Sequence, residues 1–415
     1  MRILFATWAA PGHFYPFVPL AWACQAAGLE VRVAAPPSCQ AMVRAAGLSA
    51  VAVGPDNEKP PSKEAVRHVR SWGSDRPWPD GWTARPELLD DRQTLVLDYT
   101  AGKQVALAAA MAEDLVSFAR WWRPDLVVCD TLCFAGPVAA AAIGVPHVAV
   151  GWELATLVRS ERAGRGQGWL PGYAELFEAF GVAPRACADR VIEMSPPSLR
   201  IDESFPLSRI PMRYVPFNGA GTAPSWLADQ PRRPRVCVTS GVSLARYDAG
   251  TGAEVTRKLA ESVSELGLDL VIAASRGTDL TGLPPGTRVV EGIPFHLLLP
   301  TCAAVVHHGG AGTAMTAVAS GVPQLIIPQS PMYAEIGHRV RSAGAGAVTD
   351  ADSTPEQVGA ALAELLENQR YASSLAAVRV EMAAMPAPAD VVRELTAQAF
   401  TRRSQEGIPC PTTTR

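Results

Sequence analysis

Short apolar runs without polar alternation recur along the chain, and each is followed by a turn and a helix-forming segment. Examples are RILFAT (residues 2–7), RPDLVVCD (123–130) and AAVVHH (303–308). A strand that is apolar at nearly every position must be covered on both faces, which is typical of parallel sheets flanked by helices. The pattern therefore predicts an α/β protein built from doubly wound parallel sheets.

This strand-and-helix pattern runs twice. The break is YVPFNGAGTAPSWLADQPRRP at 214–234, where Gly, Pro and charged residues concentrate. The 415 residues are enough for two such units. We expect an N-terminal domain at 1–213, an interdomain linker at 214–234 and a C-terminal domain at 235–385. A helix at 386–403 is expected to cross back to the N-terminal domain, before a disordered tail at 404–415.

Charge and composition exclude several classes of protein. The balance of 37 Lys and Arg against 40 Asp and Glu gives a net charge of −3, which offers no basic surface for nucleic acid or an anionic membrane. No apolar run reaches about 18 residues, so no membrane span is expected. The start MRILFATWAAPGH lacks a charged region and a cleavage site, and we interpret it as a strand of the mature protein. Widely spaced cysteines without a Cys-x-x-Cys pair suit a reducing cytoplasm.

The strongest local signal is AAVVHHGGAGTAM at 303–315, where an apolar strand ends in two histidines and a glycine turn opens a helix. The first turn of a helix presents unpaired N–H groups and a partial positive charge, and glycines let an anion approach the backbone. The segment therefore predicts a diphosphate site. Its expected residues are His308, Gly309, Gly310, Ala311, Gly312 and Thr313.

A tight turn whose glycines serve packing alone would give the same bare pattern. His308 favours the diphosphate site, because it adds a hydrogen-bond donor, and a cation when protonated, beside the expected anion. His307 alternates to the opposite face of the strand, where we expect a core or supporting histidine. The segment has neither the Gly-Lys-Ser/Thr of a P-loop nor Gly-x-Gly-x-x-Gly.

HHGGAGT, followed by GVPQLIIP and HRVRSAGAG, resembles the donor motif of nucleotide-sugar-dependent glycosyltransferases with the GT-B fold. The opening segment GHFYPFVPLAWACQAAGLEVRVAAPP resembles the start of the same family, and more narrowly of bacterial enzymes that decorate polyketide antibiotics. The two motifs stand near opposite ends of the chain and in the family's order, so the similarity covers most of the sequence. The resemblance implies two Rossmann-like domains that face each other across a cleft.

The resemblance also implies a nucleoside site. Residues 289–300 (VVEGIPFHLLLP) correspond to the family segment that holds the nucleobase. We expect Ile293 and Phe295, together with Gly241, to bind the nucleoside. Gly292 stands where the family usually has Trp, which leaves backbone contacts from Ile293 in place of a stacked ring.

Two further assignments come from the same resemblance. His308 would contact the donor pyrophosphate. After the PQLIIP strand, many relatives carry Asp-Gln to bind sugar hydroxyls, whereas this chain has Met332 and Tyr333. This pair at the sugar site predicts a less hydroxylated sugar, such as a deoxysugar carried on thymidine diphosphate (TDP).

His13 follows the first strand, and Asp130 ends the strand LVVCD. Both should therefore stand at the carboxyl edge of the N-terminal sheet, where α/β proteins bind ligands. An imidazole titrates near neutral pH and suits a general base, which a carboxylate can orient. Family resemblance gives His13 and Asp130 these roles of base and orienter. Capping of a following helix is the alternative for each residue.

Three tryptophans, Trp72, Trp78 and Trp82, fall in an irregular stretch at 54–100. They either form a lid over a flat, apolar aglycone or anchor the loop to its own domain, and the sequence favours neither. Phe134 and Trp152 follow strand ends on the same edge and complete the predicted acceptor pocket.

The resulting hypothesis is an inverting, metal-independent glycosyltransferase. It would move a (deoxy)sugar from a TDP-sugar to a hydroxyl, or a carbon, of a hydrophobic aglycone, with a polyketide antibiotic implied by the family. The sugar nucleotide is a co-substrate, no other cofactor is expected, and the triplet Asp350-Ala351-Asp352 is interpreted as a helix entry. A nucleotide-sugar epimerase of the same fold and a non-catalytic helper with a decayed donor site stay open as alternatives. A homodimer and a separate activating protein are also left open.

Overall fold

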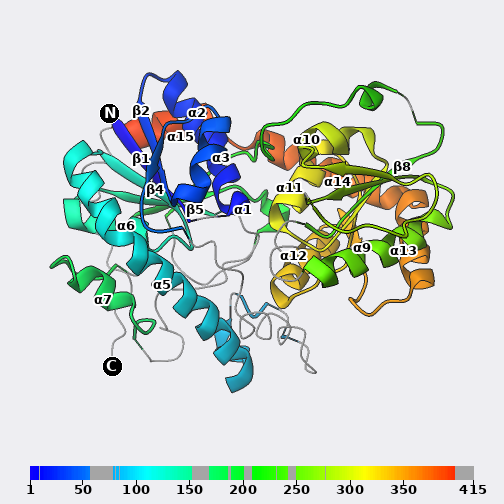
Figure 1. Ribbon diagram of the computed structural model, residues 1–415, viewed down its shortest axis with the longest axis horizontal. Helices are drawn as coiled ribbons and strands as arrows, with labels where there is room; N and C mark the ends of the chain where they lie inside the picture. The colour runs from blue at the N-terminus through cyan, green and yellow to red at the C-terminus, as the bar shows by residue number, and fades with distance from the viewer. Residues whose placement is uncertain are drawn as a thin grey trace.

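The computed structural model shows two α/β lobes side by side, one formed by each half of the chain (Figure 1). It describes residues 1–8, 10–56, 78–79, 81–83, 85–151, 168–185, 188–200, 208–229, 231–241, 249–275 and 277–397. The predicted tail at 404–415 lies outside these ranges. Among the helices described, none combines the length and the apolar character needed to cross a bilayer.

The N-terminal half contains a seven-stranded parallel sheet in the order β3-β2-β1-β4-β5-β6-β7. Its strands are β1 (Arg2–Ala6), β2 (Glu30–Ala35), β3 (Ala50–Ala52), β4 (Leu126–Asp130), β5 (His147–Gly151), β6 (Arg190–Glu193) and β7 (Arg209–Pro211). Every residue of β4 is buried, as expected of a strand that is covered on both faces. The strand order reverses between β1 and β4, which are parallel neighbours.

The C-terminal half contains a six-stranded parallel sheet in the order β10-β9-β8-β11-β12-β13. Its strands are β8 (Arg235–Thr239), β9 (Asp269–Ala274), β10 (Arg288–Glu291), β11 (Ala304–His307), β12 (Gln324–Ile326) and β13 (Gly346–Val348). Here the order reverses between β8 and β11. Doubly wound sheets bind ligands at such reversals. The two sheets confirm the predicted fold class.

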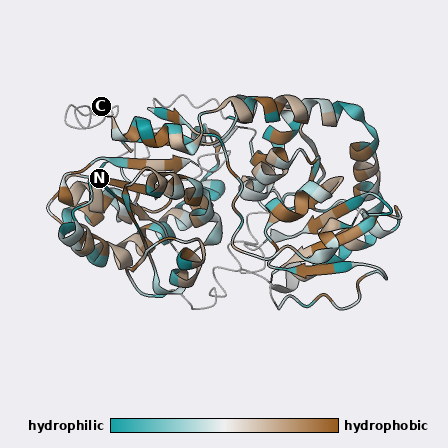
Figure 2. Ribbon diagram, turned by 90° about the horizontal axis from the view of Figure 1, so that it is seen from above, coloured by the Kyte–Doolittle hydropathy of each residue, from teal (hydrophilic) through white to brown (hydrophobic). Residues whose placement is uncertain are grey.

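Helices flank both sheets. The N-terminal half has α1 (Pro11–Phe14), α2 (Val18–Ala26), α3 (Gln40–Ala45), α5 (Asp91–Trp122), α6 (Ala135–Ile143) and α7 (Tyr173–Glu178). The C-terminal half has α9 (Ala249–Ser264), α10 (Phe295–Leu298), α11 (Ala311–Ser320), α12 (Pro331–Ser342), α13 (Pro355–Glu367), α14 (Gln369–Ala384) and α15 (Pro388–Thr396). Short 3₁₀ helices are η1 (Tyr15–Phe17), η2 (Pro37–Cys39), η3 (Pro86–Leu88), η5 (Pro197–Leu199), η6 (Ser225–Ala228) and η7 (Leu299–Thr301). Hydrophobic residues dominate the strands, whereas the helices mix both kinds (Figure 2).

The stretch expected to be irregular up to residue 100 instead ends at a long helix, α5, which begins at Asp91. Asp90 caps this helix: its carboxylate accepts a hydrogen bond from the backbone N–H of Gln93, while the Gln93 side chain accepts one from the N–H of Asp90. Such a reciprocal pair satisfies two backbone donors that the first turn leaves unpaired. The sequence expectation was wrong for these residues.

The two halves share an apolar core. One cluster of buried side chains joins β1 and α2 of the first lobe to α11, α12 and α14 of the second. The helix α15 packs against α2, and in Figure 1 it lies, in red, on the N-terminal lobe. The backbone N–H of Arg213 donates to the carbonyl oxygen of Pro386 where the chain returns. Packing between elements of both halves therefore holds the two lobes together.

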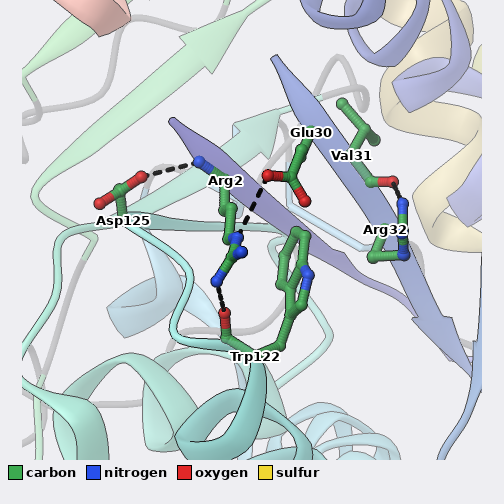
Figure 3. A network of polar contacts seen from close by, with 6 residues as sticks. All are labelled: Arg2, Glu30, Val31, Arg32, Trp122 and Asp125. Carbon is green, nitrogen blue, oxygen red and sulfur yellow. Dashed lines mark hydrogen bonds and ion pairs between the residues drawn. The ribbon is translucent and has the colours of Figure 1, made fainter.

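A polar network around Arg2 closes the amino edge of the N-terminal sheet (Figure 3). The backbone N–H of Arg2 donates to Asp125 at 2.7 Å, and its guanidinium donates to Glu30 at 3.3 Å and to the carbonyl oxygen of Trp122 at 2.8 Å. These contacts tie β1 to β2 and to the end of α5. This edge is structural and lies opposite the carboxyl edge of the sheet.

Candidate active site

The carboxyl ends of β1 and β4 lie side by side because the two strands pair in parallel. The helix α1 begins at Pro11, soon after β1, and carries His13, whereas Asp130 is the last residue of β4. Proline suits the first position of a helix, where no N–H is needed. The strand reversal thus brings together two residues that are 117 positions apart.

Nδ1 of His13 lies 3.2 Å from Oδ1 of Asp130. The carboxylate also accepts hydrogen bonds from the backbone N–H of Leu132 at 2.9 Å and from the hydroxyl of Thr7 at 3.3 Å, which fix its orientation. Because a carboxylate only accepts, Nδ1 of His13 is the nitrogen that donates in this contact, which leaves Nε2 of the neutral ring as the nitrogen that can accept a proton. An imidazole oriented in this way can take a proton from a hydroxyl.

The helix-capping alternative does not describe Asp130, since the N-cap of α6 is Phe134 and no side-chain cap is formed there. Trp8 completes the surroundings of His13. Its ring centroid lies 4.4 Å from that of His13. The sequence interpretation did not include Trp8, although a large aromatic residue two positions after β1 was a readable signal at this sheet edge.

In the C-terminal half, β11 ends at His307 and α11 begins at Ala311, with Gly310 as its N-cap. His308 follows the strand directly and is 6% exposed. The first-turn N–H groups of α11 have no acceptor within the helix, and the helix dipole places a partial positive charge there. This geometry suits an anion such as a diphosphate.

The His308 ring occupies a slot between glycine backbones. A Cβ atom on Gly241, whose φ is +75°, would lie 2.0 Å from Cε1 of His308, and one on Gly310 would lie 2.7 Å from Nε2. Tyr333 contacts the same ring edge-on, with centroids 4.7 Å apart. Gly241 follows β8, the neighbour of β11, so a residue predicted to bind the nucleoside lies against the predicted diphosphate ligand.

Burial lowers the pKa of His308 to about 3, with a smaller contribution from the neighbouring His307. The ring is therefore neutral at pH 7 and offers hydrogen bonds instead of a permanent charge. Its Nδ1 is buried and has no hydrogen-bond partner in the described part of the chain. A buried polar atom left unmatched beside a helix start is a feature that a polar ligand would satisfy.

The start of α12 contacts both halves. The side chain of Ser330 caps it by accepting from the backbone N–H of Tyr333. Tyr333 contacts His308, while Met332 packs against the apolar cluster of the N-terminal half that includes Phe134. The predicted sugar-site pair thus joins His308 to the lobe that carries His13.

The predicted nucleoside residues Ile293 and Phe295 lie at the start of α10, half-buried against an apolar cluster of the C-terminal half. Asn218, from the linker, holds this segment. Its side-chain oxygen accepts from the backbone N–H of His296, and its amide donates to the hydroxyl of Thr316 in α11. The sequence interpretation missed Asn218, because nothing local marks a linker residue that bridges two helices.

The predicted acceptor residues are only partly described. Trp82 is 3% exposed, and its ring lies 4.8 Å from that of Trp78. Both residues pack with buried Phe134 in the apolar cluster of the N-terminal half. These contacts support the anchoring role for Trp82. Trp72 and Trp152 lie outside the described residues.

The triplet Asp350-Ala351-Asp352 lies in a turn ahead of α13, whose N-cap is Thr354. Within the described ranges, no three His, Cys, Asp or Glu side chains converge as a metal site would require. The triplet thus lies in the turn that leads into α13.

Two family models match the chain: the N-terminal domain of erythromycin biosynthesis protein CIII-like proteins over residues 22–241, and the C-terminal domain over residues 257–398. The chain belongs to this family. The first match ends just after β8 and the second begins within α9, so each covers one half of this chain.

Curated relatives agree with this membership. The 10-deoxymethynolide desosaminyltransferase of Streptomyces venezuelae is 35% identical, and the alignment covers 95% of this chain and 96% of that protein. The aclacinomycin-T 2-deoxy-L-fucose transferase of Streptomyces galilaeus is also 35% identical, with coverage of 98% and 99%. This chain is a glycosyltransferase.

Solved structures share its architecture. Spinosyn rhamnosyltransferase SpnG complexed with thymidine diphosphate has a TM-score of 0.78 at 28% identity, covering 96% of this chain and 100% of that one. Glycosyltransferase VinC in complex with dTDP has a TM-score of 0.77 at 31% identity, covering 98% and 100%. This chain has the GT-B fold that its motifs predicted.

Proposed function

We propose that this glycosyltransferase moves a deoxysugar from a TDP-sugar to a hydroxyl of a hydrophobic, polyketide-type aglycone, with inversion at the anomeric carbon. The names of the two relatives and the nucleotide in the two similar structures support this substrate class. The observation that carries the proposal is that each sheet has a site residue at the point where its strand order reverses. One holds the oriented His13–Asp130 pair, and the other holds His308 beside the start of α11.

In the proposed reaction, Nε2 of His13 takes the proton of the acceptor hydroxyl. Asp130 stabilises the resulting imidazolium through Nδ1–H. The acceptor oxygen forms its bond to the anomeric carbon while the bond from that carbon to the diphosphate oxygen breaks. This single displacement inverts the configuration, and the proton on His13 passes afterwards to solvent.

The departing TDP gains negative charge on its terminal phosphate. The first-turn N–H groups of α11 and the helix dipole are positioned to stabilise charge at that point. His308 starts as a neutral ring, and the approach of a diphosphate favours its protonated form. Electrostatic stabilisation of this kind is usually a large term in group transfer.

Sugar selection rests on Met332 and Tyr333. Neither side chain offers a carboxylate or an amide to a sugar hydroxyl, and Met332 adds apolar surface between the halves. A site built to bind hydroxyls rejects a sugar that lacks them, because its polar groups would stay unpaired. The pair removes that demand and suits a deoxysugar.

No resident cofactor is part of this proposal, since the sugar nucleotide is a co-substrate and α11 supplies the positive potential for the diphosphate. Turnover should persist in excess EDTA. Loss of turnover that magnesium restores would contradict this part of the proposal.

The decisive assay combines the purified chain with TDP-deoxysugars or UDP-glucose and a panel of polyketide aglycones. Mass spectrometry should detect a glycosylated aglycone from a TDP-deoxysugar, and NMR should show an anomeric configuration opposite to that of the donor. Better turnover with UDP-glucose than with every TDP-deoxysugar would overturn the donor assignment. Isomerised sugar nucleotide in the absence of an aglycone would instead support an epimerase.

A further inference from the structure

His307 has no part in the proposed chemistry, although it stands next to His308. It is fully buried at the end of β11. Its Nε2 lies 2.9 Å from the side-chain oxygen of Gln324 on the neighbouring strand β12. Its Nδ1 lies 3.1 Å from the backbone nitrogen of Gly309, which donates to it. The ring therefore bridges the sheet and the glycine turn that precedes α11.

The hydrogen bonds fix which nitrogen carries the proton. The amide nitrogen of Gln324 donates to the carbonyl oxygen of Ala314, so the oxygen of Gln324 is the group that faces His307. That oxygen can only accept, and the N–H of Gly309 can only donate. His307 is accordingly neutral, with its proton on Nε2 and its lone pair on Nδ1. Burial lowers its pKa to about 4, which agrees with this state.

The turn that His307 holds has little room to move. Gly309 has a φ of +98°, and a Cβ atom there would lie 2.9 Å from Cβ of Tyr333 and 3.1 Å from a methyl group of Ile326. The Gly309 amide is committed to His307, so it points back toward the sheet. The following amides, from Gly310 onward, belong to the opening of α11.

We propose that His307 is a positioning residue for the diphosphate site: by accepting the Gly309 N–H, it sets the peptide orientation that aims the first turn of α11 at the diphosphate. The assignment rests on the proposed function, because it presumes a diphosphate ligand. His307 itself contacts no substrate in this account. It transmits the geometry of β12 to the anion-binding turn.

Two matched substitutions separate positioning from simple core packing. In His307→Asn, the side-chain oxygen lies near the former Nδ1 and can still accept from Gly309, but the contact to Gln324 is lost. In His307→Gln, the longer side chain reaches toward Gln324 but leaves Gly309 without its acceptor. Both variants put a neutral amide into the same buried site, so a loss of stability from the substitution itself should affect both.

TDP binding by calorimetry and donor kinetics form the first readout. His307→Asn should keep the TDP dissociation constant within about threefold of wild type, whereas His307→Gln should weaken it about tenfold or more, since a buried donor is left unpaired. In the Gln variant, KM for the donor should rise more than kcat falls. Equal effects in both variants that follow their thermal midpoints would overturn the proposal and leave His307 a packing residue.

Hydrogen–deuterium exchange of the peptide that spans 303–315 is the second readout, in the absence of nucleotide. The Gly309 amide should be protected in wild type and His307→Asn and should exchange faster in His307→Gln. Unchanged protection in the Gln variant would overturn the proposal. Because this measurement needs no TDP, a chain that fails to bind TDP at all would refute the proposed function while the role of His307 in the turn is still measured.

Discussion

His13 and His308 both lie just beyond a strand at a sheet reversal, yet their surroundings differ. Nδ1 of His13 faces the fixed carboxylate of Asp130, and the His13 side chain is 12% exposed. The His308 ring lies against glycine backbone and a tyrosine edge, with a buried Nδ1 that has no partner in the described residues. A residue that moves a proton needs an oriented partner, whereas a residue that receives a ligand needs an unmet polar atom.

The largest effect on turnover should come from replacing His13, the proposed base. His13→Ala is expected to lower kcat by about 10² to 10⁴, the usual contribution of a general base, while TDP binds as in wild type. His308→Ala should do the reverse and weaken TDP binding more than it lowers kcat at saturating donor. Calorimetry with TDP and steady-state kinetics on both variants measure these two opposite effects, on kcat and on TDP affinity. Near-normal turnover by His13→Ala would sink the base assignment.

A smaller effect should follow from filling the slot beside His308. Gly241→Ala places a Cβ only 2.0 Å from Cε1 of His308, so the ring must move, and we expect TDP affinity to fall about tenfold. Gly28 is a matched control: its φ is +77°, and a Cβ there would meet nothing within 4 Å.

Gly28→Ala carries the same backbone strain at the end of α2, away from the C-terminal site, so it should reduce thermal stability alone. Loss of TDP binding in both alanine variants to the same degree would show that the close approach of Gly241 to His308 has no functional consequence.

The sequence was sufficient to predict the strands and the sheet edge at which His13 and Asp130 meet. The run at 303–308 became β11, because a strand with both faces covered is apolar nearly throughout. The placement of His13 and Asp130 on one edge followed from parallel pairing. The start of α5 was also readable, in the Asp90–Gln93 capping box, but the polar, Pro-rich residues before it suggested a loop.

Contacts between distant segments could not be read in this way. The contact of the Trp8 ring with His13, the bridge from Asn218 to α10 and α11, and the slot around His308 each need two or three segments to meet. No local sequence pattern predicts such contacts between distant segments. Gly241 illustrates the point. The sequence analysis predicted that it binds the nucleoside, but nothing in the sequence showed that it lies against His308.

Acidification should give the smallest effect. The pKa of His308 is about 3 in the folded chain, below its ordinary value of 6.5, so between these values the unfolded chain binds a proton that the folded chain does not. Stability present at pH 7 is therefore lost as the pH falls. From pH 7 to pH 5 this ring should lower the free energy of unfolding by roughly 1 to 2 kcal/mol.

Urea unfolding of wild type and His308→Gln at both pH values measures this contribution, and the variant should lose less stability on acidification. Burial also lowers the pKa of His147, in the N-terminal half, to about 3. His147→Gln should thus reduce the pH dependence by a similar amount but leave TDP affinity unchanged. Equal weakening of TDP binding in His308→Gln and His147→Gln would contradict this prediction. It would show that His308 is no more important for TDP binding than a buried histidine of the N-terminal core.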